Sequence, residues 1–210
     1  MGLDGLERDF LNATGEKLAR FGFRSRPRGQ DFLRPMDAGQ VAVHVGFVAH
    51  HRGVDAGVDV AVRFDAVEDL VNRSNPLLSS KEKTSTFTLG AELGNLEKGK
   101  PYRVRIATTE DIEPAAGQLV AKVETIGLPY LERYSDLHAA FEVLARDDRE
   151  AWLHSPIHAA RAKRACAILA VMGRHAELQA VAERKMSFLA SLGDPSAGAF
   201  ASFVAQLSAE

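Results

Sequence analysis

The sequence predicts an α+β fold: an antiparallel sheet of about five strands in a meander, covered by an N-terminal helix and later helices, with a helical extension at the C-terminus. Two observations predict it. Apolar residues alternate with polar ones through residues 40–64, which is the period of a strand with one buried face. After residue 109 they recur instead at helical spacing. We divide the chain into a sheet domain, residues 1–146, and an extension of about three helices packed on it, residues 147–210.

The first predicted elements are a helix and a short strand. Apolar residues recur at near-helical spacing over residues 3–21, and Gly22 then marks the end of this helix. The segment QDFLRP, residues 30–35, is typical of a short strand. Residues 40–64 follow as a hairpin, with valine at alternate positions of both strands and a turn at HRGVDAG, residues 51–57.

Two more strands are predicted beyond the hairpin. A short helix over residues 65–72, capped by Asp65, and a polar loop over residues 74–83 come first. TSTFTLGAEL, residues 84–93, then predicts a strand with its threonines outward. PYRVRIATT, residues 101–109, predicts another, with apolar residues on one face and arginines on the other. Since short connections favour antiparallel neighbours, these strands complete the meander.

The rest of the chain predicts helices and their ends. We expect one helix to break at Gly127 and Pro129, and the next to be capped by Ser135. Within residues 155–208 we expect three helices packed as hairpins, because a capping residue precedes proline twice and glycine ends two apolar helical faces. These signals are Ser155-Pro156, Gly173, Gly193 and Asp194-Pro195.

Three of the seven histidines lie in the stretch HVGFVAHHRG, residues 44–53. His44 and His50 share one face of the predicted strand but stand roughly 20 Å apart along it. A single metal ion cannot reach both, because zinc ligands lie about 2 Å from the metal. His50 and His51 are neighbours and therefore point to opposite faces. We predict neither a metal site nor a cofactor for this chain.

Recognisable catalytic patterns are also missing from the sequence. It has no Gly-x-Gly-x-x-Gly loop and no Gly-x-Ser-x-Gly elbow. The single cysteine, Cys166, lies in an apolar helical run and is expected to be a buried core residue. We therefore favour a protein without catalytic residues. The alternative is an enzyme acting on a small molecule, with a site near the His50–Gly53 turn.

Charge and composition bound the partners and the compartment. The net charge of -2 argues against nucleic acid as a partner, although residues 20–34 hold five arginines. No apolar run reaches the ~18 residues of a membrane span, and the N-terminus has no basic region followed by an apolar one. One cysteine allows no disulfide within the chain. We expect a cytoplasmic protein without a membrane partner.

One segment carries a family resemblance. LARFGFRSRPRGQDFLRP, residues 18–35, resembles the domain-of-unknown-function family numbered 4304. The hairpin at residues 40–64 and GLPYLERYSD, residues 127–136, fit the same pattern, so that the similarity covers roughly residues 6–146. The resemblance implies a bacterial α+β protein, similar in architecture to small immunity partners of secreted toxins. It implies no catalytic residue, because none is assigned in that family.

The leading functional hypothesis is a non-enzymatic cytoplasmic binding protein, a toxin-neutralising immunity protein that acts by occlusion. Its partner would be another protein, such as a cognate toxin, bound by the face of the sheet that points away from the core. The predicted partner-binding residues are His44, Asp59, Arg63, Thr86, Arg103 and Arg105. Besides the enzyme, a helical protein-interaction scaffold formed by residues 155–208 stays open as an alternative.

Overall fold

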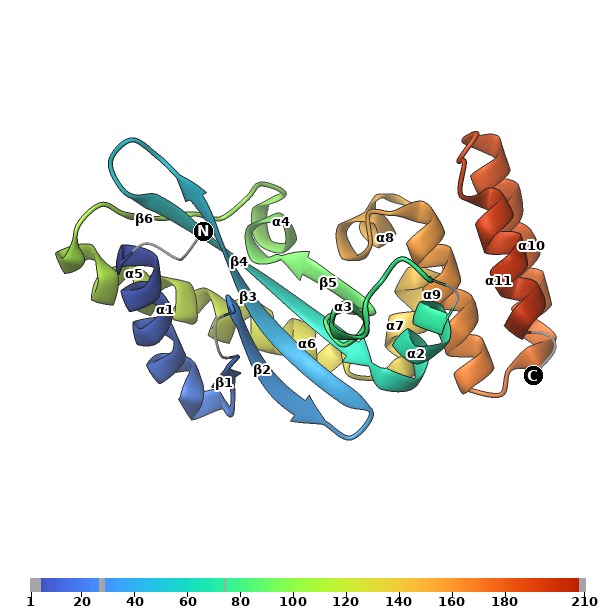
Figure 1. The fold of residues 1–210 in the computed structure, drawn as a ribbon, viewed down its shortest axis with the longest axis horizontal. Coiled ribbons are helices and arrows are strands. Elements are labelled where there is room, and N and C mark those ends of the chain that lie inside the picture. Colours follow the sequence, from blue (N-terminus) through green and yellow to red (C-terminus); the bar gives the residue numbers. More distant parts are fainter. Residues whose placement is uncertain (1–4, 27–28, 74, 208–210) are drawn as a thin grey trace. The chain divides into compact units, whose positions relative to one another are not determined.

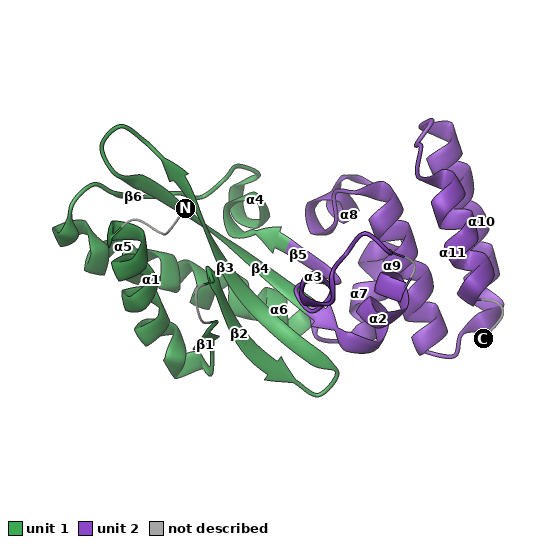
Figure 2. Cartoon of the chain, viewed as in Figure 1, with its two compact units in different colours: residues 1–62, 91–133 green, residues 63–90, 134–210 purple. Residues whose placement is uncertain are grey.

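The computed structural model describes residues 5–26, 29–73 and 75–207, and the chain forms two compact units (Figures 1 and 2). The first unit comprises residues 1–62 and 91–133, and the second comprises residues 63–90 and 134–210. The division expected at residue 146 instead falls within the second unit, because the chain crosses between the units three times.

An antiparallel sheet confirms the predicted α+β class. Its strands are β1 (Arg24–Ser25), β2 (Asp31–Met36), β3 (Gly39–Ala49), β4 (Val54–Phe64), β5 (Leu89–Glu92) and β6 (Val104–Ile106). They follow the order β1-β2-β3-β4-β5, as a meander requires. The sixth strand departs from the meander, because it pairs antiparallel with the first residues of β4 and not with β5. The long strand β4 therefore pairs with three strands: β3, β5 and β6.

Helices of the first unit cover one face of this sheet. They are α1 (Gly5–Leu18), η1 (Ala19–Phe21), α4 (Leu93–Lys98), η2 (Thr109–Asp111), α5 (Ile112–Lys122), η3 (Val123–Gly127) and α6 (Leu128–Tyr134). Helices α1 and α5 lie side by side (Figure 1), and Lys17 of α1 bonds to Glu113 of α5 at 2.6 Å. The rings of Phe10 in α1 and Phe47 in β3 meet edge to face, 6.0 Å apart. The covered face is thus the one that carries the alternate valines.

The predicted break at Gly127 and Pro129 is wrong. The chain passes from α5 through a π-helical turn, η3, directly into α6. A wide turn of this kind tolerates the missing N–H of a proline near the start of the following helix. Gly127 serves packing instead, since a Cβ there would lie 3.1 Å from a methyl group of Val60. Gly22, by contrast, ends the first helix as predicted, with a φ of 81°.

The second unit consists mainly of helices. They are α2 (Asp65–Arg73), α3 (Ser80–Lys83), α7 (Leu137–Leu144), α8 (Arg149–His154), α9 (His158–Val171), α10 (His175–Ser191) and α11 (Ala197–Leu207). The last three are the helices expected within residues 155–208, of which residue 208 lies outside the described residues. Gly173 and Gly193 follow α9 and α10 with φ of 67° and 61°, which confirms both predicted ends.

Two predicted helix starts need correction. The cap of α7 is Asp136, whose carboxylate accepts the Ala139 N–H at 2.8 Å, and not its neighbour Ser135. Helix α9 begins at His158 without a side-chain cap, two residues after Pro156. Among the described residues, no helix combines the length and the apolar character that crossing a membrane requires.

The predicted strand over residues 84–93 is also shorter than expected, because β5 begins only at Leu89. The preceding threonines do not face outward in alternation. Thr88 is fully buried, and its hydroxyl accepts the Phe64 N–H at 3.1 Å. The carbonyl and hydroxyl of Thr86 both accept hydrogen bonds from Arg63, at 2.8 and 2.9 Å. These polar contacts within the second unit hold the segment in a turn.

Candidate functional site

The sheet face opposite the helices of the first unit is polar, and we call it the polar face. Because side chains alternate along a strand, the residues between the buried valines all project from this side. We define the polar face by Asp31, His44, Asp55, Gly57, Asp59, Glu92, Arg103 and Arg105. It is the place in the described first unit where charged groups from several strands come together, and it contains four of the six predicted partner-binding residues.

Asp31, His44 and Asp59 form a row across three strands. Asp31 of β2 pairs in register with His44 of β3, and its carboxylate lies 2.7 Å from the histidine Nδ1. At the turn, the His50 N–H bonds to the Gly53 carbonyl. Continued along both strands, this register sets Asp59 of β4 opposite His44, at the short distance of cross-strand neighbours. Asp31 therefore flanks the imidazole on one side and Asp59 on the other.

The row perturbs the pKa of each of its members. The hydrogen bond that the Asp31 carboxylate accepts raises the pKa of His44, with smaller help from the charges of Asp31 and Asp59, against the effect of burial. The same hydrogen bond lowers the pKa of Asp31. Asp59 behaves differently, because burial raises its pKa and the charges of His44 and Arg103 only partly offset this. Two aspartates beside one histidine are thus shifted in opposite directions.

Arg103 lies flat over β4 where Gly57 leaves room for it. The pairing of Asp55 with Arg105, continued by two residues, brings Arg103 opposite Gly57. A Cβ at Gly57 would stand 2.5 Å from the Nη1 atom of Arg103. That nitrogen donates to the Tyr102 carbonyl at 2.6 Å and, at 3.4 Å, to Glu92. The missing side chain of Gly57 therefore lets the guanidinium rest on the sheet.

Ion pairs also connect the hairpin turn to the polar face. The Asp55 carboxylate lies 2.8 Å from His50 Nε2 and accepts a hydrogen bond from Arg105 at 3.1 Å. Arg105 donates a second hydrogen bond to the carbonyl of Arg52. Burial raises the pKa of Asp55, but the hydrogen bonds and charges of Arg105 and His50 together outweigh this effect and lower that pKa. The turn residues His50, His51 and Arg52 are exposed, so nothing in this geometry favours an enclosed substrate site there.

The two remaining predicted residues belong to the second unit. Arg63 and Thr86 bond to each other, as described above, and Arg63 also donates to Asp65 at 2.7 Å and to the Lys83 carbonyl at 3.0 Å. The Arg63 side chain is only 7% exposed. Arg63 lies on the same side of β4 as Asp59, as predicted, but its N–H groups are already hydrogen-bonded within the protein. We therefore assign Arg63 and Thr86 a structural role.

Sequence reasoning missed Asp31, Asp55, Glu92 and Gly57. Asp31 and Asp55 could have been found from strand register, since each lies directly across from a residue that was named. Glu92 could not, because its role depends on the turn that follows it. Glu92 accepts the N–H groups of Asn95 and Tyr102, at 2.8 and 2.7 Å, and so ends up beside Arg103.

The chemistry available on the polar face is that of charge and hydrogen bonding. None of its defining residues carries a hydroxyl or a thiol, so it offers no serine or cysteine nucleophile. In the part of the chain that the structure describes, no three His, Cys, Asp or Glu side chains are grouped to hold a metal ion. Cys166 is fully buried, and burial raises its pKa to about 12, which keeps it a thiol.

Replacing Asp31 with asparagine is expected to bring the pKa of His44 down towards 6.5, because the largest cause of its elevation is removed. A raised histidine pKa stabilises the fold below the unfolded pKa, and this contribution is lost as pH rises through the folded pKa. The variant should therefore lose part of that pH dependence. NMR titration of the His44 ring protons measures the shift.

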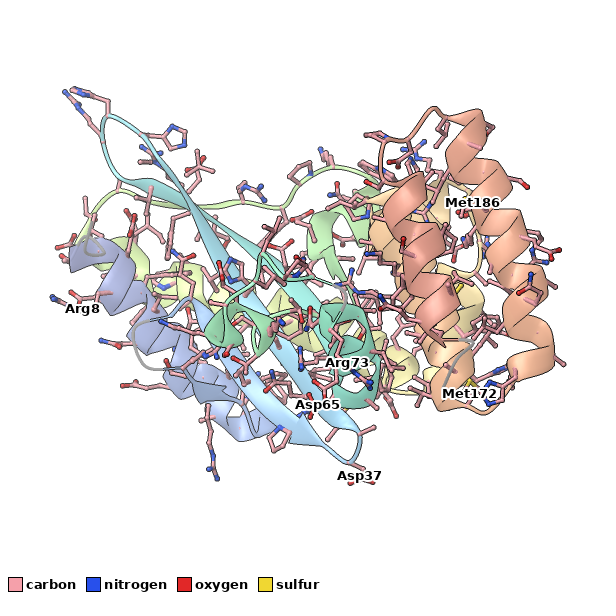
Figure 3. The ribbon with its side chains drawn as sticks, turned by 45° about the vertical axis from the view of Figure 1, so that its right-hand side comes forward. Arg8, Asp37, Asp65, Arg73, Met172 and Met186 are labelled. Atoms are coloured by element: carbon pink, nitrogen blue, oxygen red, sulfur yellow. The ribbon has the colours of Figure 1, made fainter. Side chains whose placement is uncertain are left out.

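The matched control for Asp31→Asn is Asp37→Asn, at the exposed turn between β2 and β3, where the side chain points away from the sheet (Figure 3). This control should leave the His44 titration unchanged. A His44 pKa that does not move in Asp31→Asn would show that the carboxylate does not hold the imidazole in solution.

Comparison with known proteins found no match for this chain. No protein-family model matches the chain, no curated protein matches it, and no solved structure matches it.

Proposed function

We propose that this chain is a non-enzymatic binding protein that docks onto another protein through the polar face. The observation that carries the proposal is a sheet face with both signs of charge, left accessible opposite the helical layer. The side chains of His44, Arg103 and Arg105 are 43%, 38% and 44% exposed. Charged groups in such an array orient a partner and speed its approach.

Preorganisation supports the same proposal. Three pairs fix the charged groups before any partner arrives: Asp31 with His44, Asp55 with Arg105, and Glu92 with Arg103. Side chains that are already held lose less freedom on binding, so more of the contact energy appears as affinity. Strands are also more rigid than loops as a base for an interface. A prearranged surface of this kind suits occlusion of a partner's active site.

We further propose that the partner is a toxin and that the chain neutralises it in the cytoplasm. The support is the resemblance of residues 6–146 to the family named above, whose architecture is similar to that of immunity proteins. Occlusion requires no catalytic group in the inhibitor, in agreement with the chemistry of the polar face.

Affinity purification from the native cell extract tests the proposal. The chain is used as bait in three forms: wild type, Arg103→Glu with Arg105→Glu, and the control Arg8→Glu with Arg149→Glu. All four arginines are exposed or nearly so, and the control pair lies outside the polar face. We expect one stoichiometric protein on the wild type and on the control, and its loss from the Arg103/Arg105 variant.

Recovery of the same protein by all three baits, or of none by the wild type, would overturn docking through the polar face. The toxin proposal has its own test. Expression of the recovered partner should arrest growth, and co-expression of this chain should restore it. A partner that is harmless when expressed alone would contradict neutralisation without affecting docking.

A groove in the second unit favours a helical scaffold as a second candidate function. Its volume is about 320 Å³, and it lies between α10 and α11, beside Met186 (Figure 3). The lining residues are Gln179, Ala182, Glu183, Met186, Ala201, Val204 and Ala205. Grooves of this kind receive apolar helix faces. A partner bound there should be lost with Ala201→Arg and retained by Arg103→Glu with Arg105→Glu.

A further inference from the structure

Gly46 is a glycine that the fold itself does not require. It lies in the interior of β3, and its backbone does not adopt the left-handed conformation that favours glycine. A Cβ at Gly46 would have no heavy atom of the protein within 4 Å. Glycine weakens the interior of a strand, and it often marks a place where a ligand or another chain approaches the backbone closely. The open space above Gly46 therefore points to something outside this chain.

The glycine opposite Gly46 is explained by the chain itself. The hairpin register that sets Asp59 opposite His44 also sets Gly57 opposite Gly46, two residues closer to the turn. A Cβ at Gly57 would stand 2.5 Å from Nη1 of Arg103, so glycine at this position makes room for the guanidinium. The two glycines thus leave bare backbone on neighbouring strands, and Arg103 covers that of Gly57 alone.

An exposed apolar side chain stands beside Gly46. Val48 follows two residues later on β3, and since side chains alternate along a strand, it projects from the same side. Val48 is 49% exposed, and among the described residues of the first unit it is the only large apolar residue that is exposed. His44 flanks Gly46 on the other side, roughly 13 Å from Val48 along the strand. A gap with a backbone floor and one apolar wall lies between them.

Arg103 brings a planar cation to the same place. Its Nη1 atom donates to the Tyr102 carbonyl and to Glu92, whereas Nε and Nη2 donate no hydrogen bond to any residue that the structure describes. The side chain is 38% exposed. Guanidinium groups stack on aromatic rings and are attracted by the negative charge of the ring face. The bare backbone of Gly46 therefore has an exposed valine and an incompletely bonded guanidinium as neighbours.

We infer that Gly46, Val48 and Arg103 form a seat for an aromatic side chain that the protein partner presents to the polar face. The ring packs on the backbone of Gly46 and against Val48, and Arg103 contacts its π-system. The inference rests on the proposed function and specifies which kind of residue the partner contributes. Aromatic residues are enriched in the cores of interfaces and among the residues that carry most binding energy. A carboxylate is disfavoured, because it would meet Glu92 and Asp59 beside Arg103.

The variant Gly46→Val fills the seat and tests it with the native partner. Because a Cβ at Gly46 meets no other group, and because β-branched residues favour strands, the variant should be at least as stable as the wild type in thermal unfolding. In the affinity purification described above, it should nevertheless lose the partner. The matched control is Gly117→Ala, at an exposed glycine of α5 where a Cβ also has open space. This control should retain the partner.

A small probe tests the seat without the partner. N-acetyl-tryptophan amide is titrated into the full chain and followed by NMR at the Gly46 amide and the Val48 methyl groups. N-acetyl-leucine amide, which is apolar but not aromatic, is the control probe. We expect saturable shifts with the tryptophan compound, and binding about tenfold weaker for the leucine compound and for Gly46→Val. Arg103→Lys keeps the charge but not the planar group, and it should also weaken binding of the tryptophan compound.

The outcomes separate the inference from the proposed function. If the native partner depends on Arg103 and Arg105 but binds Gly46→Val as tightly as wild type, docking through the polar face stands and the aromatic seat falls. If the tryptophan probe binds at Gly46 while the wild-type bait recovers no partner, the seat stands and the proposed function falls. Equal binding of the two probes, or no shift at Gly46, would overturn the seat even if Gly46→Val failed to fold.

Discussion

An Arg161→Ala variant is expected to lose about 3–5 kcal/mol of unfolding free energy, because it removes one member of a buried, fully bonded charge network. Arg161 is completely buried in α9. Its guanidinium donates to the carbonyls of Ser155 at 2.6 Å and Arg146 at 3.2 Å, and to the Asp147 carboxylate at 3.1 Å. It also lies 2.8 Å from the Nδ1 atom of His158. Alanine would leave the Ser155 carbonyl buried without this donor.

The network holds two buried cations against one carboxylate, which limits the loss. Lys185 of α10 is 1% exposed and donates to Asp147 at 2.7 Å and to the Arg146 carbonyl at 2.9 Å. Burial lowers the pKa of Lys185, and repulsion from Arg161 adds to this effect, while Asp147 opposes it. Without Arg161, Lys185 keeps Asp147 to itself, and its pKa should rise. The variant therefore loses the hydrogen bonds of Arg161, but the repulsion between Arg161 and Lys185 is also removed.

Denaturant unfolding followed by tryptophan fluorescence measures the effect in the second unit, because the single tryptophan, Trp152, lies in α8. Arg149→Ala is the matched control, since Arg149 is an exposed arginine in α8, the helix that holds Trp152. It should change stability by less than about 0.5 kcal/mol. A loss below about 1 kcal/mol in Arg161→Ala would mean that the network contributes little beyond its own desolvation cost.

The strongly periodic segments of the chain could be predicted from sequence. The hairpin over residues 40–64 and the three helices within residues 155–208 each bury one regular face, so local pattern and tertiary packing select the same structure. The segment over residues 84–93 could not be predicted in the same way. Its threonines alternate like a strand, but Arg63 and the Phe64 N–H engage Thr86 and Thr88. Those contacts come from residues more than twenty positions away.

The candidate site follows the same division. Alternation along β3 and β4 is a local property, and it places His44 and Asp59 on the polar face. The partners of these residues depend on how strands pair, so Asp31 and Asp55 emerge only when the register is known. Arg63 shows the limit of alternation as a guide to function. It projects from the same side of β4 as Asp59, yet its N–H groups already donate hydrogen bonds to Asp65 and to the Thr86 carbonyl.

A second large effect is expected at the ion pair of Glu68 and Arg164 in the second unit. The Glu68 side chain is fully buried and receives two hydrogen bonds from Arg164, at 2.8 and 3.2 Å. Removing one partner of such a pair costs about 3–5 kcal/mol, because the other charge stays buried and unpaired. Arg164→Met should therefore be strongly destabilised. The double variant Glu68→Met with Arg164→Met should recover most of the loss, since two methionines fill the space without burying a charge.

The pH dependence of these variants provides the more discriminating measurement. Burial alone would raise the pKa of Glu68, but Arg164, helped by the Thr86 and Thr88 hydroxyls, lowers it in the wild type. A lowered carboxyl pKa stabilises the fold above the unfolded pKa, and this is lost as pH falls through the folded pKa. In Arg164→Met burial dominates and raises the pKa of Glu68 above its unfolded value. Acid then protonates the buried carboxyl, so the difference in unfolding free energy between this variant and the double variant should shrink as pH falls.

Unfolding free energies of the wild type, both single variants and the double variant, measured from neutral pH downwards, test this directly. Other carboxyl groups titrate equally in all four proteins, so the difference between Arg164→Met and the double variant isolates Glu68. A gap between them that stays constant with pH would mean that Glu68 becomes protonated or hydrated without Arg164 already at neutral pH. Additive losses in the two single variants would mean that the two charges do not stabilise each other, despite their bidentate contact.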